Sequence, residues 1–358
     1  MAQNYAEELK ELLLTVAKEQ ASDLHLSVGR HPTLRVSRQL IPLSKKPVLT
    51  PENVQGLVFA MLSEEDRAQL FKERELDFSY SLEDKVRFRV NAFFERGFLS
   101  AAFRLVPVDI KNLKELNLPE ILRDFTRREQ GFFLVAGPTG HGKTTTLASM
   151  IDIINKERAA HILTIEDPIE YLFTPDQSLV DQREVGSDTL DFSKALRSMF
   201  RQDVNVAMIG EMRDPETMAA AVTAAETGHL IFSSLHTNNA AQTIDRIIDS
   251  FPSSQQNQIR SQLSSTLLGI FSQRLIPRVS GGLIPAYELL ISTAAVRNLI
   301  RENKIHEIDL VIETSAELGM VSLNQSLVGL IRQGDVNFEN ALAFSLNPKE
   351  LETLMGRR

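Results

Sequence analysis

The sequence of 358 residues contains no cysteine. This absence excludes disulfide bonds, cysteine-ligated iron–sulfur clusters and cysteine zinc sites, and it suits a reduced cytosolic compartment. Long apolar runs are also lacking, because no uninterrupted stretch approaches the length that spans a bilayer. The N-terminus has no basic segment ahead of its apolar residues, and Leu9, Leu12 and Val16 recur at helical spacing. This pattern predicts an amphipathic helix rather than a signal peptide, and a soluble, cytosolic chain.

An excess of positive charge is absent as well. The chain has 47 acidic against 39 basic residues, so its formal net charge is -8. This balance gives no support for a protein that coats nucleic acid, although a local basic patch is compatible with it. Hydrophobic residues make up 43% of the chain, which is enough for substantial cores, and the length predicts two domains.

Residues 1–106 are expected to form the first domain. Short, partly alternating runs such as DLHLSV and KVRFRVNAFFE are separated by turn-forming residues, and two helical stretches interrupt them around 51–62 and 63–73. Such a pattern predicts an antiparallel sheet with helices packed on it. The stretch PVDIKNLKELNLPE has a proline near each end and is the best linker candidate, which we place at 107–118.

The second domain is expected at 119–358. Apolar runs, including GFFLVAG, HILTIE, VAMIGE and LIFSSLH, alternate there with helical stretches. This alternation is typical of a parallel sheet covered on both faces, so the predicted fold class is α/β. Beyond about residue 253 the chain is expected to be mainly helical, with one strand at LIPAYELLI.

A phosphate-binding loop is predicted between the first apolar run and the helix after it. The segment GPTGHGKT, residues 137–144, fits G-x-x-x-x-G-K-[ST] at every fixed position. Glycines let several backbone N–H groups point at one phosphate, and the helix N-terminus adds partial positive charge. Lys143 is expected to reach the β- and γ-phosphates, and the Thr144 hydroxyl to bind Mg²⁺. The predicted nucleotide-binding residues are Gly137, Pro138, Thr139, Gly140, His141, Gly142, Lys143, Thr144 and Thr145. The alternative is an ordinary glycine-rich turn.

Acidic residues and a histidine end the neighbouring strands. HILTIED ends in Glu166 and Asp167, VAMIGE ends in Glu211, and LIFSSLH ends in His236. The carboxyl ends of parallel strands are where such sites form. We assign Glu211 to the side of Mg²⁺ and its water, and Glu166 to water activation, although these roles can be exchanged. His236 is either a γ-phosphate sensor or a structural histidine; the acids can also be mere strand ends.

Arginines follow one face of two strands in the first domain. In KVRFRVNAF, Arg87 and Arg89 alternate with apolar residues, and Arg104 lies in the next run, AAFRLV. A solvated sheet face is one interpretation. The other is that these guanidinium groups act on a phosphate held by another domain or subunit, as arginine fingers do.

Several long segments resemble the secretion ATPases that drive type II secretion and type IV pili. They are GPTGHGKTTTLA, TIEDPIEY, QREVG, GEMRDPETMAAAVTAAETGHLIFSSLHT and IDRIIDSFP. ASDLHLSVG and AAVRNLIREN further resemble the pilus retraction subgroup. Extension motors usually carry a four-cysteine zinc site, so the absence of cysteine favours retraction. The resemblance implies a PAS-like α+β domain, a RecA-like ATPase domain, and a motor that hydrolyses ATP to power pilus retraction and twitching motility.

The resemblance also implies site residues, cofactors and partners. It assigns catalytic roles to Glu166, Glu211, His236, Arg89 and Arg104, Mg²⁺ binding to Thr144 and Glu211, and ATP as the nucleotide. It implies a homohexamer in the cytoplasm, peripheral at the inner face of the inner membrane. Its partners would be an inner-membrane pilus platform protein and other retraction or extension ATPases, with no nucleic acid expected. Alternatives are a related motor with other cargo and an accessory subunit that assists another retraction motor.

Two local features are specific to this chain. His141 stands where the family commonly has serine, and the sequence offers no physical account of it. Arg297, Arg301 and Lys304 fall at i, i+4 and i+7, so they are expected to form one basic stripe on a helix, either for a partner or as a solvated face.

Overall fold

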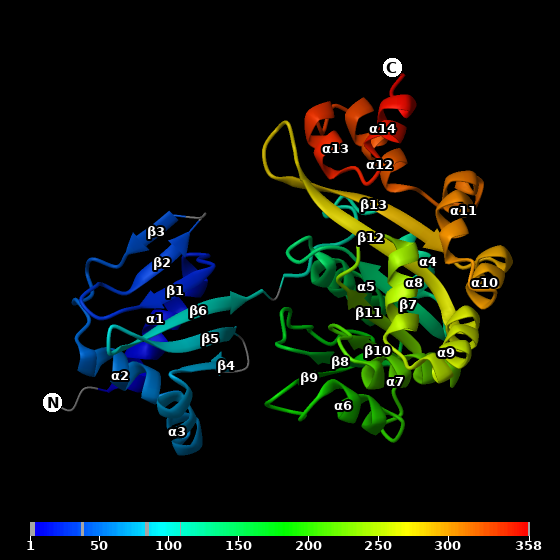
Figure 1. Ribbon diagram of the computed structural model, residues 1–358. Helices are drawn as coiled ribbons and strands as arrows, with labels where there is room; N and C mark the ends of the chain where they lie inside the picture. The colour runs from blue at the N-terminus through cyan, green and yellow to red at the C-terminus, as the bar shows by residue number, and fades with distance from the viewer. Residues whose placement is uncertain (1–3, 37–38, 83–85, 108, 357–358) are drawn as a thin grey trace. The chain divides into compact units, whose positions relative to one another are not determined.

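The computed structural model describes residues 4–36, 39–82, 86–107 and 109–356. The chain divides into two compact units (Figure 1). The first contains Met1–Asp109 and Glu170–Leu172, and the second contains Ile110–Ile169 and Phe173–Arg358. The domain boundaries expected at residues 106 and 119 stay a prediction.

Over its described residues, the first unit is a six-stranded antiparallel sheet with three helices. Its strands lie in the order β3-β2-β1-β6-β5-β4. The elements are α1 (Tyr5–Lys18), β1 (Asp23–Leu26), β2 (Thr33–Val36), β3 (Gln39–Pro42), α2 (Pro51–Phe59), α3 (Glu64–Glu73), β4 (Glu75–Leu82), β5 (Val86–Glu95) and β6 (Phe98–Val106). Capping boxes at Thr50 and Ser63 begin α2 and α3. The predicted antiparallel sheet with helices is confirmed.

The alternation of β5 places its apolar residues inside the first unit. Phe88, Val90 and Ala92 are fully buried, and they join Leu12, Leu13 and other apolar residues of α1 in one hydrophobic core. The predicted amphipathic helix is therefore α1, whose buried face contributes to this core.

The second unit is built on a seven-stranded sheet in the order β13-β12-β7-β11-β10-β8-β9. All neighbouring strands are parallel except β12 and β13. Its first elements are α4 (Leu122–Thr126), β7 (Gly131–Ala136), α5 (Lys143–Glu157), β8 (His161–Glu166), β9 (Leu179–Glu184), α6 (Phe192–Met199), β10 (Val206–Ile209), α7 (Pro215–Glu226), β11 (Leu230–Leu235) and α8 (Ala240–Asp249). Every residue of β7, β10 and β11 is buried, which explains their continuous apolar sequence.

The C-terminal part holds two strands where the sequence predicted one. Its elements are α9 (Ser253–Thr266), β12 (Leu267–Pro277), β13 (Leu283–Ile291), α10 (Ala294–Arg301), η1 (Ile305–Glu307), α11 (Ile308–Thr314), η2 (Ala316–Leu318), α12 (Leu323–Arg332), α13 (Phe338–Phe344) and α14 (Pro348–Leu354). β12 was missed because α9 runs into it directly: Leu267 is both the C-cap of the helix and the first strand residue. A helix that passes into a strand without a turn between them leaves no boundary signal in the sequence.

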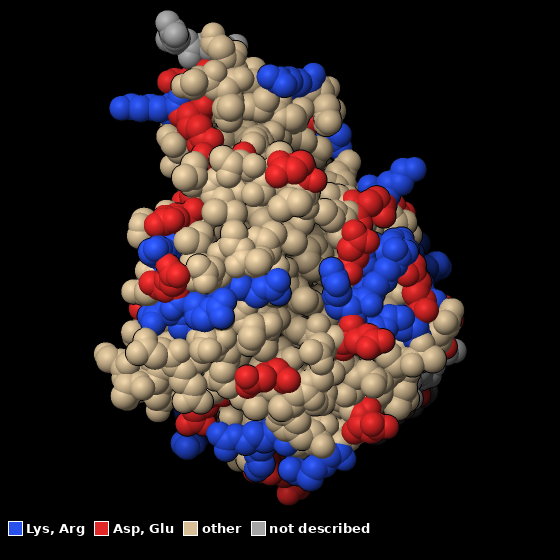
Figure 2. All heavy atoms as spheres, turned by 90° about the vertical axis from the view of Figure 1, so that its right-hand side faces the viewer, with Lys and Arg blue, Asp and Glu red and all other residues tan. Residues whose placement is uncertain are grey.

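The predicted basic stripe is wrong at one position. Arg297 and Arg301 lie on α10, but the helix ends at Arg301, and Lys304 lies beyond it with its Nζ 2.8 Å from a carboxylate oxygen of Glu302. Figure 2 shows the face of the molecule that bears the right-hand elements of Figure 1, where Lys and Arg gather in several groups with Asp and Glu between them. Within the described ranges, none of the helices combines the length and apolarity needed to cross a membrane.

Candidate active site

The glycine-rich loop joins the buried strand β7 to α5. It turns at Gly140 and Gly142, both at φ +80°, a left-handed backbone conformation that residues other than glycine rarely adopt. Gly142 is the N-cap residue of α5, so no side chain caps the first turn of the helix. Its first N–H groups therefore suit an external acceptor such as a phosphate.

Gly137 lets the loop lie close against β12. Its φ is +143°, and a Cβ atom placed there would be only 2.4 Å from the backbone oxygen of Gln273. A Cβ on Gly142 would be 3.1 Å from the side-chain nitrogen of the same glutamine. The loop is therefore shaped by contact with β12 as well as by its own glycines.

Lys143 places its ammonium group inside the loop. Its Nζ donates to the carbonyl oxygens of Gly137 at 2.9 Å and Pro138 at 3.0 Å, and lies 3.2 Å from Nδ1 of His236. The residue is only 6% exposed. A buried cation held inside a glycine-rich loop at a helix N-terminus fits a phosphate group.

His236 and Glu211 lie beside the loop. Nδ1 of His236 is 3.2 Å from the Thr139 hydroxyl, and its Nε2 is 3.3 Å from a carboxylate oxygen of Glu211. The two residues follow β11 and β10, which are adjacent parallel strands, so their carboxyl ends meet at one edge of the sheet. The structure thus brings Lys143, Glu211 and His236 together.

Arg213 is a site residue that sequence reasoning missed. It forms an ion pair with Glu211, and the hydrogen bond and charge of Glu211 raise the pKa of its guanidinium. Its signal was present in the segment GEMRD, where it stands two residues after the acid. An arginine so placed compensates the charge of Glu211 while the carboxylate also faces His236.

Glu166 occupies a different environment from Glu211. It ends β8 and is only 2% exposed. Its Oε1 accepts hydrogen bonds from the Thr164 hydroxyl at 2.7 Å and from Nε2 of Gln182 at 3.3 Å. Two donors stabilise a buried carboxylate, because an unpaired one would be costly. The assignment of Glu166 to water activation stays a prediction.

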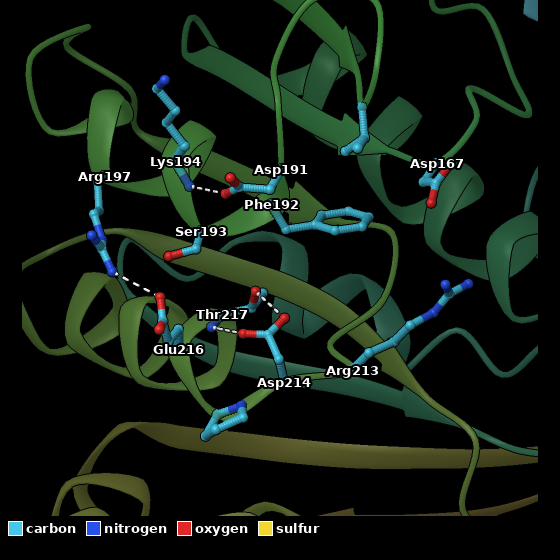
Figure 3. Close-up of a pocket in the computed structure, with 12 residues that line it drawn as sticks. Asp167, Asp191, Phe192, Ser193, Lys194, Arg197, Arg213, Asp214, Glu216 and Thr217 are labelled. Carbon is cyan, nitrogen blue, oxygen red and sulfur yellow. Dashed lines mark hydrogen bonds and ion pairs between the residues drawn. The ribbon is translucent and has the colours of Figure 1, made fainter. Parts of the chain in front are cut away.

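A cavity of about 720 Å³ opens beside the loops that follow β8 and β10. Asp167 and Arg213 line it together with the first residues of α6 and α7 (Figure 3). Asp191 caps α6 through the N–H of Lys194, at 2.6 Å, and Asp214 caps α7 through the N–H of Thr217, at 2.8 Å. These aspartates therefore fix the start of each helix, and Asp214 thereby fixes the loop that carries Glu211.

His141 is tied to β12 through both its side chain and its backbone. The N–H of Leu275 donates to Nδ1 of His141 at 2.8 Å, and Nε2 of Gln273 donates to its carbonyl at 2.6 Å. Gln273 is 2% exposed, and its Oε1 also accepts from the Thr146 hydroxyl on α5 at 2.6 Å. Gln273 was missed because its strand was missed.

The two predicted arginine fingers lie in the first unit. Arg89 on β5 and Arg104 on β6 are paired across the strands, and both residues are exposed. Nε of Arg104 donates to the buried Asp23 at 2.9 Å, although 71% of the arginine side chain is exposed. The predicted alternation of β5 is confirmed, while a role of either arginine toward a phosphate stays a prediction.

The loop residues also fit a magnesium ion that accompanies a nucleotide. Thr144 is the second residue of α5, directly after Lys143. Among the residues the structure describes, no group of three or more His, Cys, Asp or Glu side chains is placed to hold a metal ion. Mg²⁺ in nucleotide sites takes one or two protein oxygens and completes its shell with phosphates and water. The assignment of Thr144 and Glu211 to Mg²⁺ stays a prediction.

Comparisons with known proteins agree over most of the chain. The model of the type II/IV secretion system protein family matches residues 3–342. The chain is 44% identical over 334 residues to the type IV pilus retraction ATPase PilT of Pseudomonas aeruginosa, covering 93% of this chain and 97% of that protein. It is 45% identical over 306 residues to a twitching motility protein of Neisseria gonorrhoeae, covering 85% and 82%. A crystal structure of the pilus retraction motor PilT with bound ADP has a TM-score of 0.89 at 46% identity, covering 96% of this chain and 98% of that one.

Proposed function

We infer that this chain, which belongs to the family of type II/IV secretion system proteins, is a pilus retraction ATPase that drives twitching motility. The observation that carries this conclusion from the site itself is the convergence of Lys143, Glu211 and His236 on the glycine-rich loop. A cation for phosphate, an acid beside it and a histidine between them are the parts of a nucleotide-hydrolysing site.

Each residue has a distinct part in the proposed reaction. Lys143 and the N–H groups of the loop bind the β- and γ-phosphates of ATP. Thr144 and Glu211 would hold Mg²⁺, which would neutralise the charge that develops on the phosphate oxygens. His236 reports the γ-phosphate to the acid, a role that its contacts with both the loop and Glu211 support. Glu166 or Glu211 orients and deprotonates the attacking water.

We further propose how the motor assembles. The ATPase is a cytoplasmic homohexamer, peripheral at the inner membrane, that acts on a pilus platform protein and works with other retraction or extension ATPases. Arg89 and Arg104 reach the phosphates of ATP, either within one chain or from a neighbour in the ring, and hydrolysis releases them. Release changes the arrangement of the domains and so converts hydrolysis into motion.

The test is ATP turnover by the purified full chain, with the particle mass measured in the same samples. Lys143→Ala is expected to lose nucleotide binding, whereas Glu211→Gln is expected to bind ATP and lose turnover by about a hundredfold or more. Wild-type turnover no faster than that of both variants, in the assembled particle, would contradict the motor function.

A deletion strain separates retraction from the alternatives. If the chain is the retraction motor, pili of the deletion strain extend but do not retract, and the Glu211→Gln gene does not restore retraction. Normal retraction in the deletion strain would instead assign the chain to other cargo or to an accessory role.

A further inference from the structure

His141 lies between two residues that leave the loop free to move. Gly140 and Gly142 flank it, both in the left-handed conformation, and a Cβ atom on Gly140 would meet open space. Glycine has the largest conformational entropy to lose when a loop is ordered. A contact at His141 therefore determines how well the crest of the loop keeps its shape.

The contact with β12 requires a neutral imidazole. Because the N–H of Leu275 donates to Nδ1 at 2.8 Å, Nδ1 carries no proton, and the ring hydrogen is on Nε2. A second proton on Nδ1 would set two N–H groups against each other. The donor of this bond is the backbone N–H of Leu275, so the bond does not depend on the leucine side chain.

The surroundings of the ring favour the neutral form. Burial lowers the pKa of His141, and the charges of Arg274 on β12 and Lys143 on α5 lower it further. On the third side stands Phe344 of α13, an uncharged ring whose centroid lies 6.4 Å from that of His141, edge to face. Burial and the two cations thus oppose protonation, while the Phe344 ring adds no charge that would favour it.

We propose that His141 is a positioning residue for the nucleotide: its neutral ring accepts the N–H of Leu275 and holds the loop in its phosphate-binding form, and gaining a proton releases it. The inference rests on the proposed nucleotide site. The imidazole ring connects the loop to β12 through this one bond.

The experiment measures ADP binding to the full chain without Mg²⁺, from about pH 8 to about pH 5.5. Near pH 8, His141→Ala is expected to weaken ADP binding about fivefold, the equivalent of one hydrogen bond, and His141→Asn to stay within about twofold because its Oδ1 can accept the same N–H. Below about pH 6.5 wild-type binding weakens more steeply than that of His141→Asn. Protonation of ADP itself affects all variants equally, so the ratio between them isolates the histidine.

Two further variants make the outcomes distinct. His306→Asn is the same chemical change at an exposed histidine, and its pH profile is expected to follow the wild type. Lys143→Ala supplies the reference without binding. Parallel profiles for wild type and His141→Asn would overturn the positioning role, whereas a wild-type chain that binds no more ADP than Lys143→Ala would overturn the nucleotide site itself.

Discussion

Glu288 gives a quantitative test of how the second unit is packed. It lies on β13, is 7% exposed, and its Oε1 accepts the N–H of Ala240 at the start of α8, at 2.7 Å. Burial raises the pKa of its carboxyl from 4.5 to about 7, against the opposing effect of the Ala240 hydrogen bond. The fold therefore prefers the protonated acid.

The sign of the pH effect follows from this preference. Below about pH 4.5 the acid is protonated in the folded and the unfolded chain, so the folded state keeps its full advantage. As the pH rises from about 4.5 to about 7, the unfolded chain loses the proton first and is favoured. The difference between the pKa of 4.5 in the unfolded chain and about 7 in the folded chain corresponds to about 3 kcal/mol of unfolding free energy.

Glu288→Gln removes this titration and keeps an acceptor for Ala240. We expect the variant to gain up to about 3 kcal/mol over wild type near pH 8, or about 6–12 °C in Tm, and the gain to vanish near pH 4.5. The chain has no tryptophan, so far-ultraviolet circular dichroism is the suitable signal. The control is the same change at the exposed Glu129. A difference between variant and wild type that is equal at both pH values would refute the reasoning.

Three further predictions, one with a matched control variant, concern individual contacts. Gly137→Ala is expected to cost several kcal/mol of stability and most nucleotide binding, because its Cβ would overlap the backbone oxygen of Gln273. The control is Gly140→Ala, whose Cβ meets open space and which costs only about 1 kcal/mol of backbone strain. Equal effects of the two variants in thermal melts would contradict the overlap. Gln273→Leu removes the hydrogen bonds to the His141 carbonyl and from the Thr146 hydroxyl and is expected to lower stability by about 1–3 kcal/mol, as chemical denaturation can show. Asp23→Asn removes the carboxylate charge that pairs with Arg104 and is expected to reduce ATP turnover about two- to fivefold without loss of ADP affinity; unchanged turnover would argue against the arginine's role.

The sequence was sufficient to predict the loop and the residues at the strand ends. A phosphate-binding loop is a continuous motif, and Glu211 and His236 stand at the ends of uninterrupted apolar runs. Parallel pairing brings such ends to one edge of the sheet, and the strand order β7-β11-β10 places these three side by side. The convergence of Lys143, Glu211 and His236 is therefore a consequence of local patterns and one topological rule.

The partners of the loop were not predictable in the same way. Gln273 and Leu275 are more than 130 residues away from His141 in sequence, and they lie on a strand that begins without a turn. A helical pattern that passes directly into a strand hides the boundary, and the register that aims Gln273 at the loop is set by packing. The account of His141 consequently needed the structure.

The position of the strands in the sheet has a consequence for local stability. β7, which leads into the loop, lies between β12 and β11, whereas β9 is an edge strand paired only with β8. Amide hydrogens of β7 should therefore exchange with solvent only through global unfolding, and those of β9 through local opening. Since β9 carries Gln182, a donor to Glu166, partial opening at this edge would disturb the acid while leaving the phosphate loop intact. Heat is accordingly expected to impair hydrolysis at temperatures where nucleotide still binds.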